Sequence, residues 1–220
     1  MSWLLPLVWL AAAPASTAPP PMTPEVRSLV ERMQAFYEKT TDFTADFRQD
    51  YAYKTFGRTV TSTGTVAFQK PAKMRWEYLT PSKRTFVLSG DKIYALDPDA
   101  QTLTKASLPQ SQLSASVTFL WGRGKLADEF QIQRTDCKEC TGQLLSLIPK
   151  KPDPRFQEIR LEIDPKTAQV VRSVVVDPDG SENSIRYSNL KTNVRLSKET
   201  FTLTPPPGTQ ILDTTAPRAP

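Results

Sequence analysis

Apolar residues recur at every second position along most of this chain, which is the period of a β-strand with one buried face. Glycine, proline and aspartate interrupt the alternation, as in Ser89-Gly90-Asp91 and Asp177-Pro178-Asp179-Gly180, and such residues favour tight turns. The pattern therefore predicts antiparallel strands that follow one another along the chain. They are expected at 43–53, 58–70, 73–78, 85–89, 92–96, 102–107, 130–135, 144–149, 156–164, 169–177, 184–190 and, as a short last strand, 201–203.

Two segments change to the helical period of three and four. The first follows Thr23-Pro24-Glu25, an N-cap residue, a proline suited to the first helical position and an acid in the first turn. It continues to about residue 40 with apolar positions at Val26, Leu29, Val30, Met33, Phe36 and Tyr37. The second spans 112–121, ends before Gly122 and Gly124, and has apolar positions at Leu113, Val117, Leu120 and Trp121.

A single antiparallel sheet of this length has to curl, because twisted sheets do not stay flat over so many strands. The two helices need an apolar surface to cover, and the concave face of the sheet provides one. We therefore predict a mainly β (α+β) fold, a strongly curved sheet with helices on its concave face, in one domain spanning 24–212. The patterning does not decide whether that face encloses a filled core or a cavity for a ligand.

Both ends of the chain differ from this central domain. An apolar run of about eleven residues, 3–13, is too short to span a bilayer and leads into Ala13-Pro14-Ala15, the small-residue pattern of a signal-peptidase site. We expect residues 1–18 to be a signal peptide, although no Lys or Arg precedes the run and a buried N-terminal segment is the alternative. Proline-rich stretches at 19–23 and 213–220 are expected to be an extended arm and a flexible tail.

The composition excludes several classes of activity. The 220 residues contain no histidine, which removes histidine-based acid–base catalysis, serine–histidine and cysteine–histidine nucleophiles, and most zinc or iron sites. The net charge of +5 is spread along the chain, so a nucleic-acid partner is not expected. No catalytic set or cofactor motif is present, and we expect a binding protein that is not an enzyme. Serine–lysine or paired-carboxylate catalysis is neither indicated nor excluded.

Cys137 and Cys140 are the two cysteines of the chain and form a C-x-x-C in a predicted turn between strands. A thioredoxin-type redox site would place this pair before a helix, and a zinc site would need two further ligands. In an oxidising compartment, a local disulfide that holds the turn is the favoured interpretation.

The segment 68–78 is the most unusual of the chain. Pro71 separates two strands, so the sheet is expected to bend or jog there. One face of the second strand presents Met74, Trp76 and Tyr78, which are either ordinary core or the lining of a hydrophobic groove. Adaptable Met and aromatic side chains suit a groove that accepts variable acyl chains. Lys70, just before the bend, is placed to donate a hydrogen bond to a carbonyl at the rim.

Several motifs resemble the LolA family, the periplasmic lipoprotein carriers of Gram-negative bacteria. The most specific is 64–78, GTVAFQKPAKMRWEY, and it is preceded by FTADFRQ at 43–49. SGDKIYALDP at 89–98, FLWGRG at 119–124 and FTLTPPPGT at 201–209 follow in the family's order. The resemblance covers about 24–212. The C-x-x-C and the tail after Leu212 depart from the family pattern, which leaves partner contacts in the tail in doubt.

This resemblance implies an unclosed antiparallel β-barrel with helices as a lid over an apolar cavity, in a periplasmic protein expected to be monomeric. It implies transfer of triacylated lipoproteins from an inner-membrane ABC transporter to an outer-membrane receptor. The family's cationic cavity position falls on Lys70 and an apolar one on Met74. The expected cavity residues are Phe47, Val66, Phe68, Lys70, Met74, Trp76 and Tyr78, and the expected lid residues are Leu29, Met33, Phe36, Leu113, Val117 and Leu120.

Two other functions are compatible with the same fold. The protein could carry or sense another lipid in the periplasm. It could also have a structural role in the envelope without a ligand, in which case the face with Met74, Trp76 and Tyr78 would be dry core. The first alternative differs from lipoprotein transport in the bound molecule, and the second in whether a cavity exists.

Overall fold

The computed structural model describes residues 22–107 and 125–215. The predicted signal peptide and most of the arm, the helix predicted at 112–121 with Leu113, Val117 and Leu120, and residues 216–220 of the predicted tail lie outside the described residues.

Helix α1 (Pro24–Lys39) forms where the sequence predicts it. The side-chain oxygen of Thr23 accepts a hydrogen bond from the backbone N–H of Val26, Glu25 lies in the first turn and Lys39 in the last. These charges complement the helix dipole. One face of α1 is buried, namely Val26, Leu29, Val30, Met33 and Tyr37.

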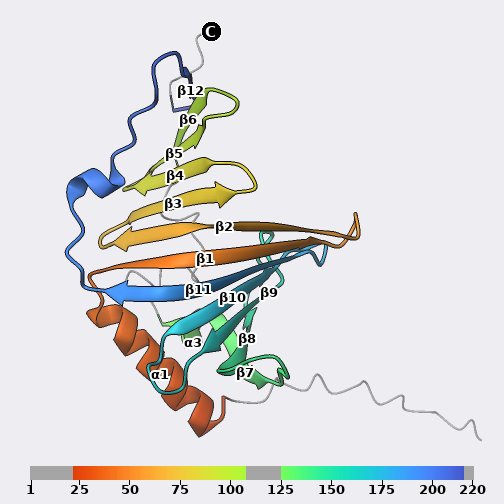
Figure 1. Ribbon diagram of the computed structural model, residues 1–220. Helices are drawn as coiled ribbons and strands as arrows, with labels where there is room; N and C mark the ends of the chain where they lie inside the picture. The colour runs from red at the N-terminus through yellow and green to blue at the C-terminus, as the bar shows by residue number, and fades with distance from the viewer. Residues whose placement is uncertain (1–21, 108–124, 216–220) are drawn as a thin grey trace, which may run out of the picture.

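Twelve strands of the described residues form one sheet in the order β12-β6-β5-β4-β3-β2-β1-β11-β10-β9-β8-β7 (Figure 1). Apart from one pair, neighbours run antiparallel. The strands are β1 (Asp42–Tyr53), β2 (Arg58–Gln69), β3 (Lys73–Thr80), β4 (Arg84–Ser89), β5 (Lys92–Asp97), β6 (Thr102–Ser107), β7 (Phe130–Thr135), β8 (Gln143–Pro149), β9 (Glu158–Ile163), β10 (Val170–Val176), β11 (Glu182–Thr192) and β12 (Gln210–Asp213).

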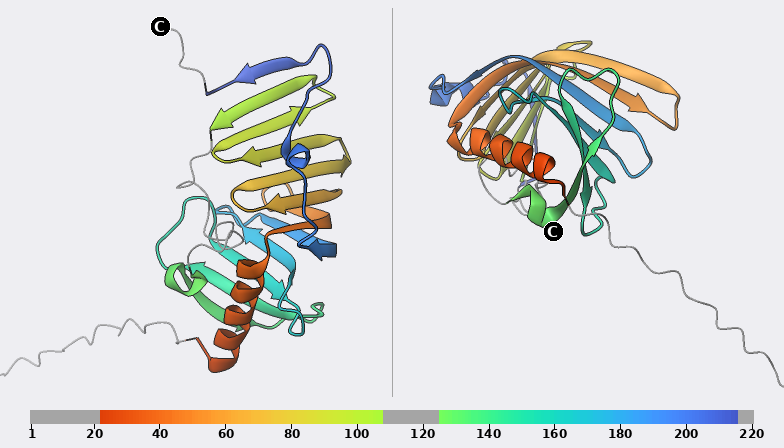
Figure 2. Two further views of the ribbon diagram at one scale, coloured as in Figure 1. Left: turned by 90° about the vertical axis from the view of Figure 1, so that its left-hand side faces the viewer. Right: turned by 90° about the horizontal axis from the view of Figure 1, so that it is seen from below.

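The sheet curves into an open half-barrel, and α1 lies inside its concave side (Figure 2). Its edge strands, β12 and β7, do not pair with each other. The long strands β1, β2 and β11 form the middle, because β1 pairs with both of the others. The short helix α3 (Leu126–Glu129) precedes β7. One hydrophobic cluster joins α1 to the concave face, which confirms the predicted fold class.

The C-terminal part corrects one prediction. The segment expected as a last strand at 201–203 is not a strand: η3 (Lys198–Phe201) is a 3₁₀-helix, and Phe201 is buried. The last strand is β12, and it pairs with β6 in parallel, with Ile211 beside Leu103. Three prolines at 205–207 lie between η3 and β12. Proline cannot donate the backbone hydrogen bonds that a strand needs, so this stretch does not form one.

Pro71 lies in a turn and does not bend or displace a strand within the sheet. Residues 70–72 form the turn of a hairpin in which β2 and β3 pair antiparallel. In this register Phe68 lies opposite Met74, Val66 opposite Trp76, and Gly64 opposite Tyr78. The hairpin therefore brings the apolar residues of the two strands together on the concave face.

Candidate apolar binding site

The concave face contains a cavity of about 270 Å³ between α1 and the sheet. Its walls, as far as residues 22–107 and 125–215 form them, are almost entirely apolar and include no charged side chain. The lining residues come from α1, from β1–β3 and from β9–β11: Tyr37, Phe43, Val66, Met74, Trp76, Ile159, Leu161, Val170, Ser173, Val175, Ile185, Tyr187 and Leu190. A larger hollow of about 780 Å³ is lined by Asp46, Arg75, Glu77 and several threonines, so it does not suit an apolar ligand.

Three of the predicted cavity residues, Val66, Met74 and Trp76, line this cavity. The β2–β3 register explains why, since it sets Val66 directly opposite Trp76. The indole Nε1–H of Trp76 donates to the thioether sulfur of Met74 at 2.8 Å, which satisfies the one polar group that the indole carries into an apolar wall.

The other predicted aromatic residues lie beside the cavity. Phe68 is fully buried and stacks on Phe43, with ring centroids 5.0 Å apart. Phe47 contacts Trp76 at 4.8 Å and Tyr78 at 5.0 Å, edge to face in both cases. Its ring lies over Gly64, where a Cβ atom would come within 2.7 Å of the Phe47 Cε1 atom. Phe68 and Phe47 therefore pack against the lining residues Phe43 and Trp76 without lining the cavity themselves.

The few polar groups of the cavity are hydrogen-bonded within the protein. The Tyr37 hydroxyl accepts from the backbone N–H of Val170 at 3.2 Å, and the hydroxyls of Ser173 and Tyr187 lie 3.3 Å apart. Burial raises the pKa values of both tyrosines, so they stay neutral at ordinary pH. The described lining residues therefore present no charge to a ligand and need none from it.

Lys70 is not among the residues that line the cavity, and its ammonium is hydrogen-bonded to α1. Its ammonium donates to the backbone oxygens of Tyr37 at 2.7 Å and Glu38 at 3.0 Å, in the last turn of α1. The Tyr37 oxygen also accepts from the backbone N–H of the C-cap residue Thr40 at 3.2 Å, and a cation at this end complements the helix dipole. Burial lowers the pKa of Lys70, and Glu38 opposes that shift. Lys70 thus fastens the β2–β3 turn to the end of α1.

The predicted lid residues of α1 face the sheet. Leu29 and Met33 are fully buried, and Phe36 is partly buried against the same cluster. Phe36 also packs edge to face on Tyr37, with centroids 5.0 Å apart. The remaining predicted lid residues, on the second helix, are not among the described residues.

Sequence reasoning missed the opposite wall of the cavity. Ile159, Leu161, Val175, Ile185 and Tyr187 come from β9, β10 and β11. Their alternation predicts strands with one buried face, but it does not indicate which distant strands they will oppose. Only the curvature of the whole sheet brings β9–β11 across from β3.

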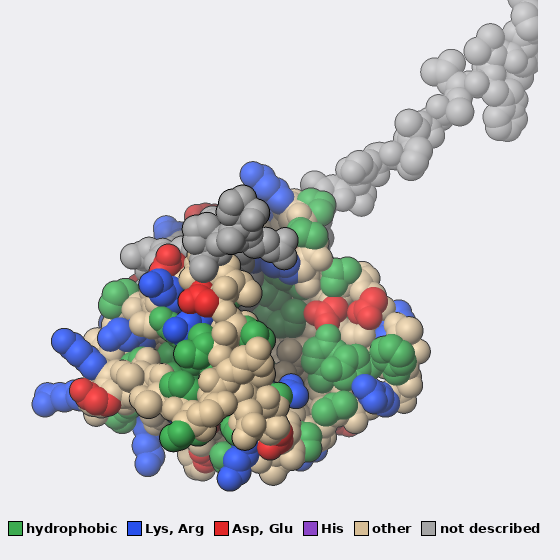
Figure 3. Space-filling model, turned by 90° about the horizontal axis from the view of Figure 1, so that it is seen from above, with side chains coloured by type: hydrophobic (Ala, Val, Ile, Leu, Met, Phe, Trp, Pro, Cys, Tyr) green, Lys and Arg blue, Asp and Glu red, His purple; other side chains and the backbone are tan. Residues whose placement is uncertain are grey.

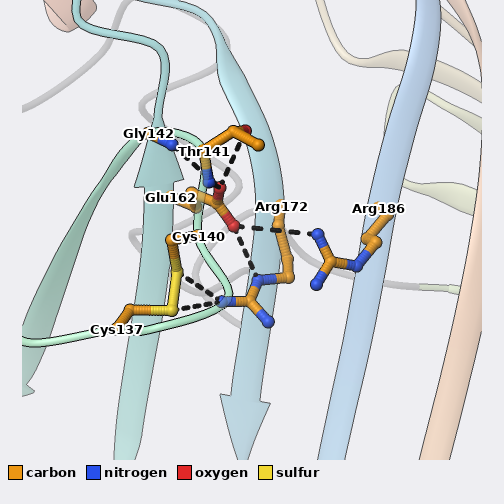
Figure 4. Close-up of a disulfide and its surroundings, with 7 residues drawn as sticks. All are labelled: Cys137, Cys140, Thr141, Gly142, Glu162, Arg172 and Arg186. Atoms are coloured by element: carbon orange, nitrogen blue, oxygen red, sulfur yellow. Dashed lines mark hydrogen bonds and ion pairs between the residues drawn. A yellow bond between two sulfur atoms is a disulfide. The ribbon is translucent and has the colours of Figure 1, made fainter.

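The two cysteines form a disulfide on the hairpin between β7 and β8. The carboxylate of Glu162, fully buried, accepts hydrogen bonds from the backbone N–H groups of Thr141 at 2.8 Å and Gly142 at 3.1 Å (Figure 4). Its other oxygen lies 3.0 Å from Nε of Arg172, whose guanidinium also reaches the sulfur of Cys140 at 2.9 Å. This cluster fixes the disulfide turn against β9 and β10.

Comparison with known proteins identifies related sequences. The profile of a family described as "Outer membrane lipoprotein carrier protein LolA" matches residues 38–204. An outer-membrane lipoprotein carrier protein of Dechloromonas aromatica is 28% identical over 83% of this chain and 86% of its own length. One of Chromobacterium violaceum is 26% identical over 96% of this chain and 98% of its own length.

The fold also resembles solved structures. A conserved protein from Thermus thermophilus superposes with a TM-score of 0.54 at 12% identity, over 85% of this chain and 98% of that protein. At this level of identity the likeness concerns the fold alone. Among the helices of the described residues, none combines the length and hydrophobicity needed to cross a bilayer.

Proposed function

The chain belongs to the LolA family of outer membrane lipoprotein carrier proteins, and we propose that it binds the acyl chains of lipoproteins in the concave cavity and carries them between membranes. The observation that carries the proposal is a cavity whose described lining residues carry no charge and whose few polar groups are already paired inside the protein. An acyl chain needs only such a surface, and its burial contributes about 0.8 kcal/mol per CH₂ group.

The cavity has to enlarge before it can hold several acyl chains. Its volume of about 270 Å³ is slightly below the roughly 300–1,000 Å³ typical of pockets for drug-sized ligands. Helix α1 lies on the concave side of the sheet (Figure 2), and its Tyr37 lines the cavity. Seen from above, the molecule also has a hollow with hydrophobic side chains in its depth (Figure 3). We propose that α1 moves away from the sheet on loading, and that Lys70 releases the helix end.

The route follows from the family. We propose that residues 1–18 direct export to the periplasm, that an inner-membrane ABC transporter loads the protein with triacylated lipoproteins, and that an outer-membrane receptor, where the organism has one, receives them. A disulfide between Cys137 and Cys140 is compatible with an oxidising compartment. A soluble carrier has a clear physical use there, because acyl chains cannot cross an aqueous space unshielded.

The test is release of a triacylated lipoprotein from spheroplasts into the soluble fraction by the purified, secreted protein. We compare wild type with Met74→Glu, which puts a charge into the cavity wall, and with Met74→Leu as the volume-matched apolar control. Met74 is only partly buried, so the glutamate variant is expected to fold, which circular dichroism checks. Wild type and Met74→Leu should release the lipoprotein, and Met74→Glu should not.

Failure of release by wild type would contradict lipoprotein transport. Lipids extracted from the protein purified from its native periplasm would then identify any other apolar ligand of the cavity. If Met74→Glu instead releases the lipoprotein as well as wild type does, the cavity assignment is wrong.

A further inference from the structure

The hairpin between β1 and β2 extends beyond its neighbours in the sheet (Figure 1). Its turn carries Phe56, whose side chain is 72% exposed, the highest value for a large hydrophobic residue in the described part of the chain. A single exposed hydrophobic residue is ordinary on a protein surface. Phe56 differs because it lies at the end of a projecting hairpin, beside another aromatic ring and a cation.

A tyrosine and an arginine accompany Phe56. The Tyr53 ring lies 6.3 Å from the Phe56 ring, and the guanidinium of Arg58 lies 5.4 Å from the first centroid and 5.8 Å from the second. The other nearby cation, Lys54, lies over Gly180, in the turn that also contains Asp179, so acidic side chains offset its charge. Arg58 is therefore the available cation of the tip, which we define as residues 53–58.

Aromatic side chains connect the tip to the cavity along the concave face. Tyr53 contacts Tyr51, with centroids 4.3 Å apart. Both residues border a shallow hollow of about 290 Å³ that also touches Tyr78. Tyr78 packs on Phe47, and Phe47 packs on Trp76 in the cavity wall. A row of rings thus leads from an exposed tip to the enclosed apolar site.

We propose that the tip docks on the surface of an anionic bilayer, with Phe56 at the boundary of headgroups and acyl chains and Arg58 on lipid phosphate, and that the aromatic row guides acyl chains between membrane and cavity. The proposal rests on the carrier function proposed above. Aromatic rings with a polar or cationic neighbour are typical of the membrane interface. A protein partner would need about 800 Å² from each side, more than one hairpin turn offers.

Co-sedimentation with vesicles tests the docking. The full secreted protein is mixed with vesicles of phosphatidylethanolamine and phosphatidylglycerol, or with pure phosphatidylcholine, and the partition coefficient is measured. Phe56→Ser should lower binding to the anionic vesicles about tenfold, and Arg58→Ser about fivefold. Two controls change an exposed apolar and an exposed cationic residue elsewhere: Ile148→Ser on β8, and Lys138→Ser in the disulfide turn. Both should bind as wild type does.

Equal vesicle binding by wild type and Phe56→Ser would overturn the proposal, as would an equal loss of vesicle binding in Ile148→Ser. Binding to a protein partner without any binding to vesicles would overturn it as well. Loading from a detergent-solubilised triacylated lipoprotein is measured in parallel, because it needs no membrane. Phe56→Ser should load as wild type does in that assay. Wild type that binds vesicles but does not load would refute the carrier function and leave the docking surface in place.

Discussion

Lys70 connects the β2–β3 turn to helix α1, the element that moves in the proposed lid mechanism. It belongs to the β2–β3 turn, beside the cavity strands, and its two hydrogen bonds end on the last turn of α1. An apolar side chain at this position would leave those carbonyls without their cation. The sequence predicts that the Lys70 ammonium donates to a carbonyl of a bound ligand. In this structure the ammonium donates to the carbonyl oxygens of Tyr37 and Glu38.

We predict that Lys70→Met lowers the free energy of unfolding by about 1–2 kcal/mol. Hydrogen bonds to a charged group contribute roughly 1.5–3 kcal/mol, and the partial solvent exposure of the Lys70 bonds reduces that contribution. Urea denaturation followed by circular dichroism measures the change. Lys70→Arg keeps the charge and donors and should lose less. If both variants match wild type, Lys70 does not hold α1.

At the level of elements, the β7–β8 hairpin depends on a buried charge cluster. Glu162 is fully buried on β9, while Arg172 on β10 is largely buried beside it. Arg186 on β11 is the more distant cation, 3.9 Å from the carboxylate. A buried carboxylate is tolerated only with partners that compensate its lost hydration, and here two backbone N–H groups and Arg172 provide them.

A double-mutant cycle should reveal this dependence. We predict that Glu162→Gln costs about 3 kcal/mol or more, because it leaves Arg172 largely buried without its counter-charge. In Glu162→Gln/Arg172→Met the loss should be smaller than the sum of the single losses. Guanidinium denaturation of the oxidised protein measures all four corners. Additive losses would mean that the two side chains do not interact across β9 and β10.

The local pattern of the sequence predicts some of these strands and not others. Strands such as β7 (Phe130–Thr135) alternate cleanly and pair with a neighbour in the chain, so local pattern was sufficient for them. Strand β12 was missed because its two apolar residues, Ile211 and Leu212, are adjacent and exposed, and its partner β6 lies about a hundred positions earlier. The cavity wall from β9–β11 was missed for the related reason that curvature is a long-range property.

Considered as a whole molecule, the described residues form an open half-barrel with one long helix inside it (Figure 2). Closure would join β12 to β7 and fix the width of the interior. Because these edges stay apart, the concave side can widen when its cover moves. The covering contacts of α1 are apolar, apart from bonds such as those of Lys70 and the one that Arg32 donates to the Pro165 oxygen at 2.7 Å. Such contacts can be replaced by acyl chains at little net cost.

This exchange predicts a specific dynamic signature. Loading with a triacylated lipoprotein should increase amide hydrogen exchange in α1, particularly around Met33 and Tyr37, because acyl chains take the place of the helix on the sheet. The strands β8, β9 and β10 should keep their protection, since their ladder hydrogen bonds do not change. Mass spectrometry of the loaded and empty protein measures both regions. Met74→Glu treated in the same way should show no change, because it does not load. If instead α1 becomes more protected on loading, the helix closes over the ligand without leaving the sheet, and the widening mechanism is wrong.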